Sequence, residues 1–184
     1  TNPLGHQDQF TYTAQGLRTS WTNKRGFVTT YGHDANGELI SATDPAGGTV
    51  SATRNPRGYV MTILDAAGNA TTIGRNTRDE ATSVTLPTGG SYLVGWTNSG
   101  LQQSVQDPTG ASFSVTFGAT KQIKSRTDAM SGVLSFERKG DGFVVKLIDE
   151  LGRSEVFARD LAGRMTARTD AEGGTWTYTY DCCD

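Results

Sequence analysis

The sequence predicts an all-β protein of tandem antiparallel β-hairpins, arranged as a long, twisted and curved strip of sheet. Three observations share one period of 21 residues and support this prediction: two glycine series, a turn motif at those glycines, and a column of apolar residues. Glycine accounts for 23 of the 184 residues, about twice its usual share of roughly 7%. We therefore interpret residues 1–184 as a single array of about nine repeats.

Glycine recurs at two positions of the period. The first series comprises Gly16, Gly37, Gly58, Gly100, Gly142 and Gly163. Asp79 and Lys121 occupy the vacant positions of that series. The second series comprises Gly26, Gly47, Gly68, Gly89, Gly110, Gly152 and Gly173, and Ser131 occupies its vacant position. The two series interleave at spacings of 10 and 11, so the repeat is a doublet of half-repeats.

A turn motif of Asp or Asn, two further residues and Gly coincides with these glycines. Its clearest copies pair Asp34 with Gly37, Asp44 with Gly47, Asp65 with Gly68, Asp107 with Gly110, Asp149 with Gly152, Asp160 with Gly163 and Asp170 with Gly173. In a type I turn the first side chain accepts a bond from the N–H two residues on, and glycine takes up a positive φ without a Cβ clash. Such a turn followed by a left-handed glycine joins antiparallel strands. The spacing leaves about six or seven residues for each strand.

Every 21st residue from Phe10 is apolar or aromatic. This column consists of Phe10, Tyr31, Ala52, Ile73, Val94, Val115, Phe136, Phe157 and Tyr178, and we expect it to form the core of the repeat. A second column, of small hydroxyl residues, consists of Ser20, Ser41, Thr62, Ser83, Ser104 and Ser125. Because side chains alternate between the faces of a strand, we expect one apolar face and one face of Ser, Thr and charge. Residues 143–148 are the best candidate for a continuously buried strand.

A parallel β-solenoid with one 21-residue rung is the alternative architecture, because its rungs also stack like residues in columns. Reversals of direction every 10 or 11 residues favour antiparallel hairpins instead.

The repeat resembles the YD repeat of RHS proteins, whose pattern reads Tyr-Asp-x-x-Gly-Arg-Leu and, after a short spacer, Asp-Pro-x-Gly. The best copies are residues 160–165 followed by 169–175, and residues 34–39 followed by 43–49. The resemblance covers essentially the whole chain. It departs from the family at the signature Tyr, which precedes only Asp181, and in the middle of the chain, where turn residues vary while the spacing is kept.

In RHS proteins such repeats form a β-sheet shell around a toxin or its remnant. The resemblance therefore implies a structural segment, a fragment of a larger shell that encloses or carries a toxin or effector. It further implies a bacterial protein that is secreted or lies at the cell surface, with neighbouring repeats and an enclosed toxin domain as partners.

A cell-surface adhesion or carbohydrate-binding module is the alternative from a different functional class. Trp21, Tyr92, Trp96 and Trp176 could stack on sugars if they are exposed. The same residues follow the strand alternation and also suit the apolar face.

The residues argue against an enzyme, a cofactor site and a metal site. His6 and His33 are the only histidines and lie near one end, so no nucleophilic triad has a base. The carboxylates stand at turn starts, and calcium-binding repeats use a shorter, nine-residue unit. Cys182 and Cys183 are adjacent, so we expect no structural disulfide between them.

The charge pattern argues against a nucleic-acid partner. The net charge is −2, and no run of basic residues exceeds two, whereas binding to the phosphate backbone needs clustered Lys and Arg. No apolar stretch approaches the ~18 residues of a membrane span. The sequence begins at Thr1 and not at a methionine, so we expect a processed or excised segment.

Overall fold

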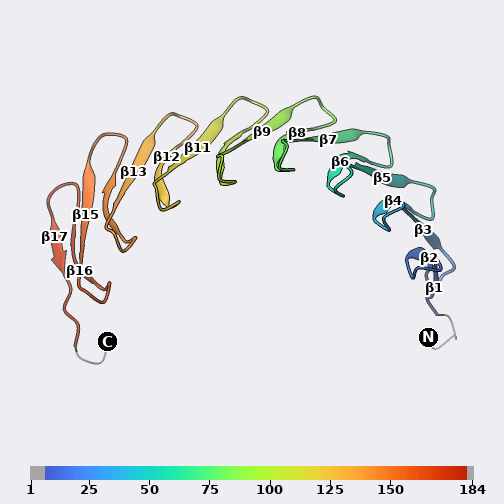
Figure 1. Cartoon of the computed structure of the whole chain (residues 1–184), viewed down its shortest axis with the longest axis horizontal. Coiled ribbons are helices and arrows are strands. Elements are labelled where there is room, and N and C mark those ends of the chain that lie inside the picture. Colours follow the sequence, from blue (N-terminus) through green and yellow to red (C-terminus); the bar gives the residue numbers. More distant parts are fainter. Residues whose placement is uncertain (1–6, 182–184) are drawn as a thin grey trace. The chain divides into compact units, whose positions relative to one another are not determined.

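The computed structural model describes residues 7–181, and their regular secondary structure consists of β-strands (Figure 1). The strands are β1 (Gln9–Tyr12), β2 (Arg18–Thr22), β3 (Val28–His33), β4 (Leu39–Thr43), β5 (Thr49–Arg54), β6 (Val60–Leu64), β7 (Ala70–Arg75), β8 (Ala81–Thr85), β9 (Ser91–Trp96), β10 (Gln102–Gln106), β11 (Ser112–Phe117), β12 (Ile123–Thr127), β13 (Val133–Arg138), β14 (Val144–Ile148), β15 (Ser154–Arg159), β16 (Met165–Thr169) and β17 (Thr175–Thr177). They form one open antiparallel sheet. The predicted fold of tandem hairpins is confirmed, and the parallel solenoid is wrong.

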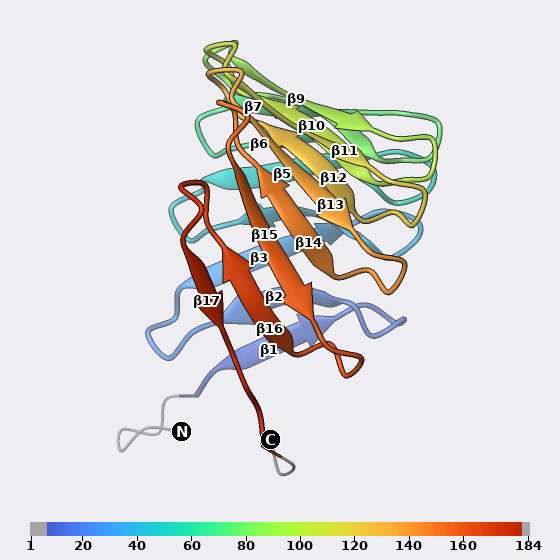
Figure 2. The same ribbon diagram turned by 90° about the vertical axis from the view of Figure 1, so that its left-hand side faces the viewer.

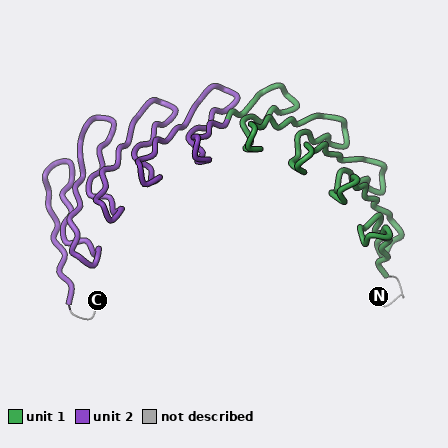
Figure 3. Tube along the Cα trace, viewed as in Figure 1, with its two compact units in different colours: residues 1–93 green, residues 94–184 purple. Residues whose placement is uncertain are grey.

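The chain divides into two compact units, Thr1–Leu93 and Val94–Asp184 (Figure 3). In the first unit, each of β2 to β8 pairs with the strand before it and the strand after it. In the second unit, β11 to β16 do the same. Strands therefore lie side by side in chain order within each unit (Figure 2). That all residues act as a single array stays a prediction.

The doublet of 10 and 11 residues follows from the lengths of the strands and turns. Between β4 and β5 the turn takes five residues, 44–48, one more than the four of the predicted motif. Most strands therefore contain five or six residues, fewer than the six or seven expected. Strands of five residues alternate with strands of six from β2 to β16, and this alternation produces the unequal half-repeats.

A β-bulge absorbs the extra residue in alternate hairpins. The pairing of β3 with β4 passes from Gly32–Ser41 to His33–Leu39, which leaves Ile40 as the extra residue. The register shifts in the same way between β5 and β6, β7 and β8, β11 and β12, β13 and β14, and β15 and β16. A bulge at a fixed place in the repeat keeps the alternation of side chains in step with the turns.

The sheet is a single layer, and no side chain of residues 7–181 is buried. The accessible surface is 12273 Å², whereas a compact protein of 19.6 kDa would expose about 8,600 Å². The prediction that residues 143–148 form a continuously buried strand is therefore wrong. They supply β14, whose residues are half-buried, and Phe143 is 43% exposed, because no second layer covers the sheet.

Glycine and threonine alternate at one position of the hydroxyl face. Thr11 and Thr116 each place Oγ1 2.6 Å from the Oγ of the serine opposite, Ser20 and Ser125 respectively. Gly74 faces Ser83 instead, and the serine hydroxyl fills the space where a Cβ of residue 74 would lie. The same site therefore accepts either a glycine or a threonine whose hydroxyl bonds to the serine.

The two kinds of glycine can be separated with one substitution. Gly74→Thr should raise the free energy of unfolding by about 0.5–1 kcal/mol, because glycine weakens a strand interior and Thr can pair with Ser83. Gly68 has a φ of 84° and open space around it, so Gly68→Thr should lower the free energy by about 1–2 kcal/mol. Urea unfolding followed by circular dichroism measures both. Changes of the same sign in the two variants would contradict this account.

Candidate functional site

The most regular feature of the molecule is a five-residue turn closed by two main-chain bonds. In the turn that follows β4, Gly47 N donates to Asp44 O at 3.0 Å and Asp44 N donates to Gly48 O at 2.9 Å. Sixteen turns within residues 7–181 have both bonds, and they begin at Thr13, Asn23, Asp34, Asp44, Asn55, Asp65, Asn76, Leu86, Thr97, Asp107, Gly118, Asp128, Lys139, Asp149, Asp160 and Asp170. Their starts alternate in spacing between 10 and 11 residues. The turn is thus the unit that the sequence repeats.

The first side chain of the turn makes two bonds and not one. Oδ1 of Asp44 accepts from the N–H of Ala46 at 2.8 Å, as the motif predicts, and also from the N–H of Gly48 at 2.9 Å. The other predicted turn aspartates make the same pair of bonds: Asp34, Asp65, Asp107, Asp149, Asp160 and Asp170. The second bond was not foreseen from the sequence, because it depends on the left-handed residue directing the next N–H inward.

The predicted glycines occupy the left-handed position of these turns. Gly37, Gly47, Gly68, Gly110, Gly152, Gly163 and Gly173 have φ values between 77° and 91°. Asp79, Lys121 and Ser131, which fill the vacant positions of the series, are left-handed too, at 62°, 62° and 68°. The surroundings differ between turns: a Cβ on Gly163 would lie 2.9 Å from the ring of Phe143, whereas nothing lies within 4 Å of one on Gly68. Some turns therefore require glycine for space as well as for φ.

Arginine substitutes for the signature tyrosine before several turns. Arg54, Arg75, Arg138 and Arg159 each donate from Nη1 to the carbonyl of the left-handed residue four positions on, at 2.7–2.9 Å. Arg75 also reaches Val60 O at 3.2 Å, and Tyr180, which is the tyrosine before Asp181, donates to Met165 O at 2.7 Å. Both contacts span 15 residues, so either side chain braces its turn against the preceding strand. Sequence reasoning missed this role, although the 21-residue spacing of the arginines was a usable signal.

The apolar column lies on one face of the sheet. Cross-strand neighbours on this face include Ile73 with Val84 and Phe136 with Leu147. Most of the predicted column is half-buried by such neighbours: Tyr31, Ala52, Ile73, Val94, Val115, Phe136 and Phe157. Phe10 is 46% exposed, and Tyr178, which follows β17, is 41% exposed. The column therefore forms a partly covered surface and no enclosed core.

Arginines lie over several aromatic rings of the sheet. The guanidinium of Arg18 stands 4.4 Å from the ring centre of Tyr31, and that of Arg168 stands 5.4 Å from that of Trp176. Such cation–π contacts shield part of each ring from water while leaving the charge solvated.

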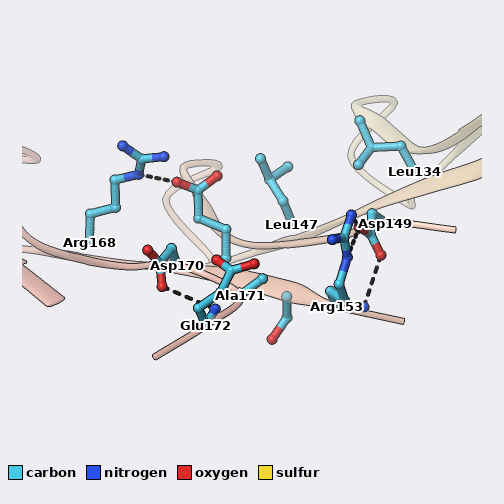
Figure 4. A pocket seen from close by; sticks show the side chains of 10 residues that line it. Leu134, Leu147, Asp149, Arg153, Arg168, Asp170, Ala171 and Glu172 are labelled. Atoms are coloured by element: carbon cyan, nitrogen blue, oxygen red, sulfur yellow. Dashed lines mark hydrogen bonds and ion pairs between the residues drawn. The ribbon is translucent and has the colours of Figure 1, made fainter. Parts of the chain in front are cut away.

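A depression in the second unit brings charges together without free chemistry (Figure 4). Arg153 pairs with Asp149 at 2.7 Å, and Arg168 pairs with Glu155. Leu147 lies between these two pairs in Figure 4. No group of three or more His, Cys, Asp or Glu residues within the described range could hold a metal ion. The depression thus presents paired surface charges and no nucleophile with a base.

The aromatic residues that suggest sugar stacking differ in exposure. Tyr92 is 40% and Trp176 is 47% exposed, whereas Trp21 and Trp96 are half-buried. The indole N–H of Trp21 donates to Asp8 at 3.3 Å. Carbohydrate binding by these residues stays a prediction. His6, Cys182, Cys183 and Asp184 lie outside the described residues.

The described residues include no helix long and apolar enough to cross a membrane.

Comparison with known proteins identifies one matching family model and several similar structures. Residues 12–49 match the model named RHS Repeat. A crystal structure of TcdB2-TccC3-TEV is similar with a TM-score of 0.57 and 15% identity, over 92% of this chain and 11% of that chain. A crystal structure of TcdB2-TccC3 is similar with a TM-score of 0.58 and 11% identity, over 95% of this chain and 12% of that one. No curated protein matches the sequence.

The present chain spans only about a tenth of the length of those solved structures. At these identities the likeness shows the fold, and it agrees with the all-β hairpin repeat described above.

Removing one turn carboxylate tests the two-bond geometry. Asp44→Ala should lower the free energy of unfolding by about 1 kcal/mol, because two main-chain N–H groups lose their acceptor. Asp44→Asn keeps an oxygen in the same place and should lose less. Thermal unfolding of both variants gives the comparison, and equal losses would show that the side-chain bonds contribute little.

Acid should weaken the turns. Hydrogen bonds from Asn69 lower the pKa of Asp65, and a bond from the hydroxyl of Thr109 lowers the pKa of Asp107, both below the ordinary 3.8. A carboxylate with a lower pKa in the folded state stabilises the fold above the unfolded pKa and loses that contribution as pH falls through the folded pKa. The double variant Asp65→Asn/Asp107→Asn should therefore lose less stability than the wild type between about pH 5 and pH 2. Urea unfolding at a series of pH values measures this, and parallel pH curves would refute it.

Proposed function

We propose that this RHS-repeat chain is a structural segment of an RHS-type shell that encloses a toxin or effector. The observation that carries the proposal is the single-layer sheet of repeated hairpins, whose turns are regular and whose two faces are both accessible. A sheet of this kind suits a wall, because main-chain ladders and turns hold it together without an enclosed core.

The chemistry of the two faces supports a role at a boundary. One face presents half-buried apolar and aromatic side chains such as Phe136 and Phe157, and the other presents Ser, Thr and Gly. An apolar face in water favours contact with other polypeptide, either neighbouring repeats or the enclosed domain. The match of residues 12–49 to the RHS Repeat model agrees with this assignment.

In this proposal the segment is not catalytic, and its partners are adjoining repeats and the enclosed polypeptide. The parent protein is bacterial and acts after secretion or at the cell surface. Support for the non-catalytic role comes from the turn aspartates, whose Oδ1 atoms already accept main-chain bonds.

A labelling experiment on the full-length parent protein tests enclosure. Val50 and Thr53 lie in β5, are both exposed, and point to opposite faces because they are three residues apart. Val50→Cys and Thr53→Cys are made separately with Cys182 and Cys183 replaced by Ser. If the strip is part of a closed shell, a small maleimide should label both cysteines, and a polymer-linked maleimide too large to enter the lumen should label only one. Equal labelling of both by the large reagent would refute a closed shell and favour an open adhesion module.

A further inference from the structure

Asp79 occupies a position where most repeats have glycine, and its carboxylate is well covered. The residue is left-handed, with a φ of 62°, a conformation that costs a residue with a Cβ about 1–2 kcal/mol. Its side chain is only 11% exposed, in a protein whose described residues include no buried one. A strained residue with a covered charge requires compensating interactions.

The compensating partners come from the preceding turn on the same edge of the sheet. Arg57 Nη1 lies 2.5 Å from Asp79 Oδ2, and Asn55 Nδ2 donates to Asp79 Oδ1 at 2.7 Å. Arg57 also donates to Thr77 O at 3.2 Å. Both carboxylate oxygens of Asp79 therefore bind the turn between β5 and β6, although Asp79 belongs to the turn between β7 and β8.

A third contact fixes the main chain of the same residue. Arg75 Nη1 donates to Asp79 O at 2.7 Å, its Nε donates to Val60 O at 3.2 Å, and its guanidinium stands 5.1 Å from the ring centre of Tyr59. Val60 and Tyr59 belong to β6 and to the turn before it. Asp79 is thus held at its side chain and at its carbonyl by groups that also contact the preceding hairpin.

We propose that Asp79 is a latch that couples two successive hairpins, β5–β6 and β7–β8, so that they open to solvent together and not one at a time. The latch occupies the glycine position because a left-handed residue there can direct a carboxylate toward the preceding turn. It trades the conformational freedom of glycine for a connection between repeats. This inference concerns the mechanics of the sheet and does not depend on what a shell would enclose.

Hydrogen exchange of the parent protein, resolved by peptide, tests the latch with the variant Asp79→Gly. Glycine relieves the strained φ, so a residue that is merely tolerated there would become more protected on replacement. If Asp79 is a latch, amide protection in residues 55–80 should instead fall at least about threefold, the lower end of typical coupling between contacting residues. Increased protection throughout residues 55–80 would overturn the proposal.

Two further variants keep the test specific. Lys121→Gly makes the same change at the equivalent position two repeats on, and it should increase protection of its own turn. Arg57→Ala and Asp79→Ala, alone and combined, should give non-additive losses of protection, because each removes the same ion pair. Strict additivity in that cycle would also overturn the latch.

Discussion

The structure depends on the main-chain bonds of its five-residue turns, because a single-layer sheet has no buried core to fix the register of its strands. A slip of one residue between neighbouring strands would move every side chain to the opposite face. The turns prevent such a slip by closing each hairpin at the same two carbonyls, as Asp44 and Gly47 do after β4. The bulge at Ile40 and its equivalents then adjusts the pairing by one residue at a constant place in the repeat.

The same dependence explains how turn residues vary in the middle of the chain while the period persists. Leu86, Gly118 and Lys139 begin turns without a carboxylate, amide or hydroxyl in the first side chain, yet both main-chain bonds form. Lys121 and Ser131 are left-handed without being glycine. Side-chain bonds therefore add to turns whose backbone geometry already exists. The spacing is the stricter constraint, since an inserted or deleted residue would displace all later strands.

The fold and the turns could be predicted because their signals are local or strictly periodic. The glycine spacing even marked Asp79, Lys121 and Ser131 as left-handed positions. Contacts between repeats could not be predicted in this way. The brace from Arg75 to Val60 O joins residues 15 apart, and the ion pair of Arg57 with Asp79 joins residues 22 apart. Which side chains meet at those separations depends on the bulge and the twist of the strands, which no single motif encodes.

The apolar column shows a different limit of sequence reasoning. Period-two alternation correctly indicates which residues share a face, and Phe136 and Leu147 do lie opposite one another. Alternation does not indicate what covers that face, however. The half-buried state of Val115, Phe136 and Phe157 shows that neighbouring strands cover only part of each side chain. The remaining apolar surface is therefore available to another polypeptide, and a repeated strip that leaves it available along each unit is better suited to line a boundary than to enclose a small-molecule site.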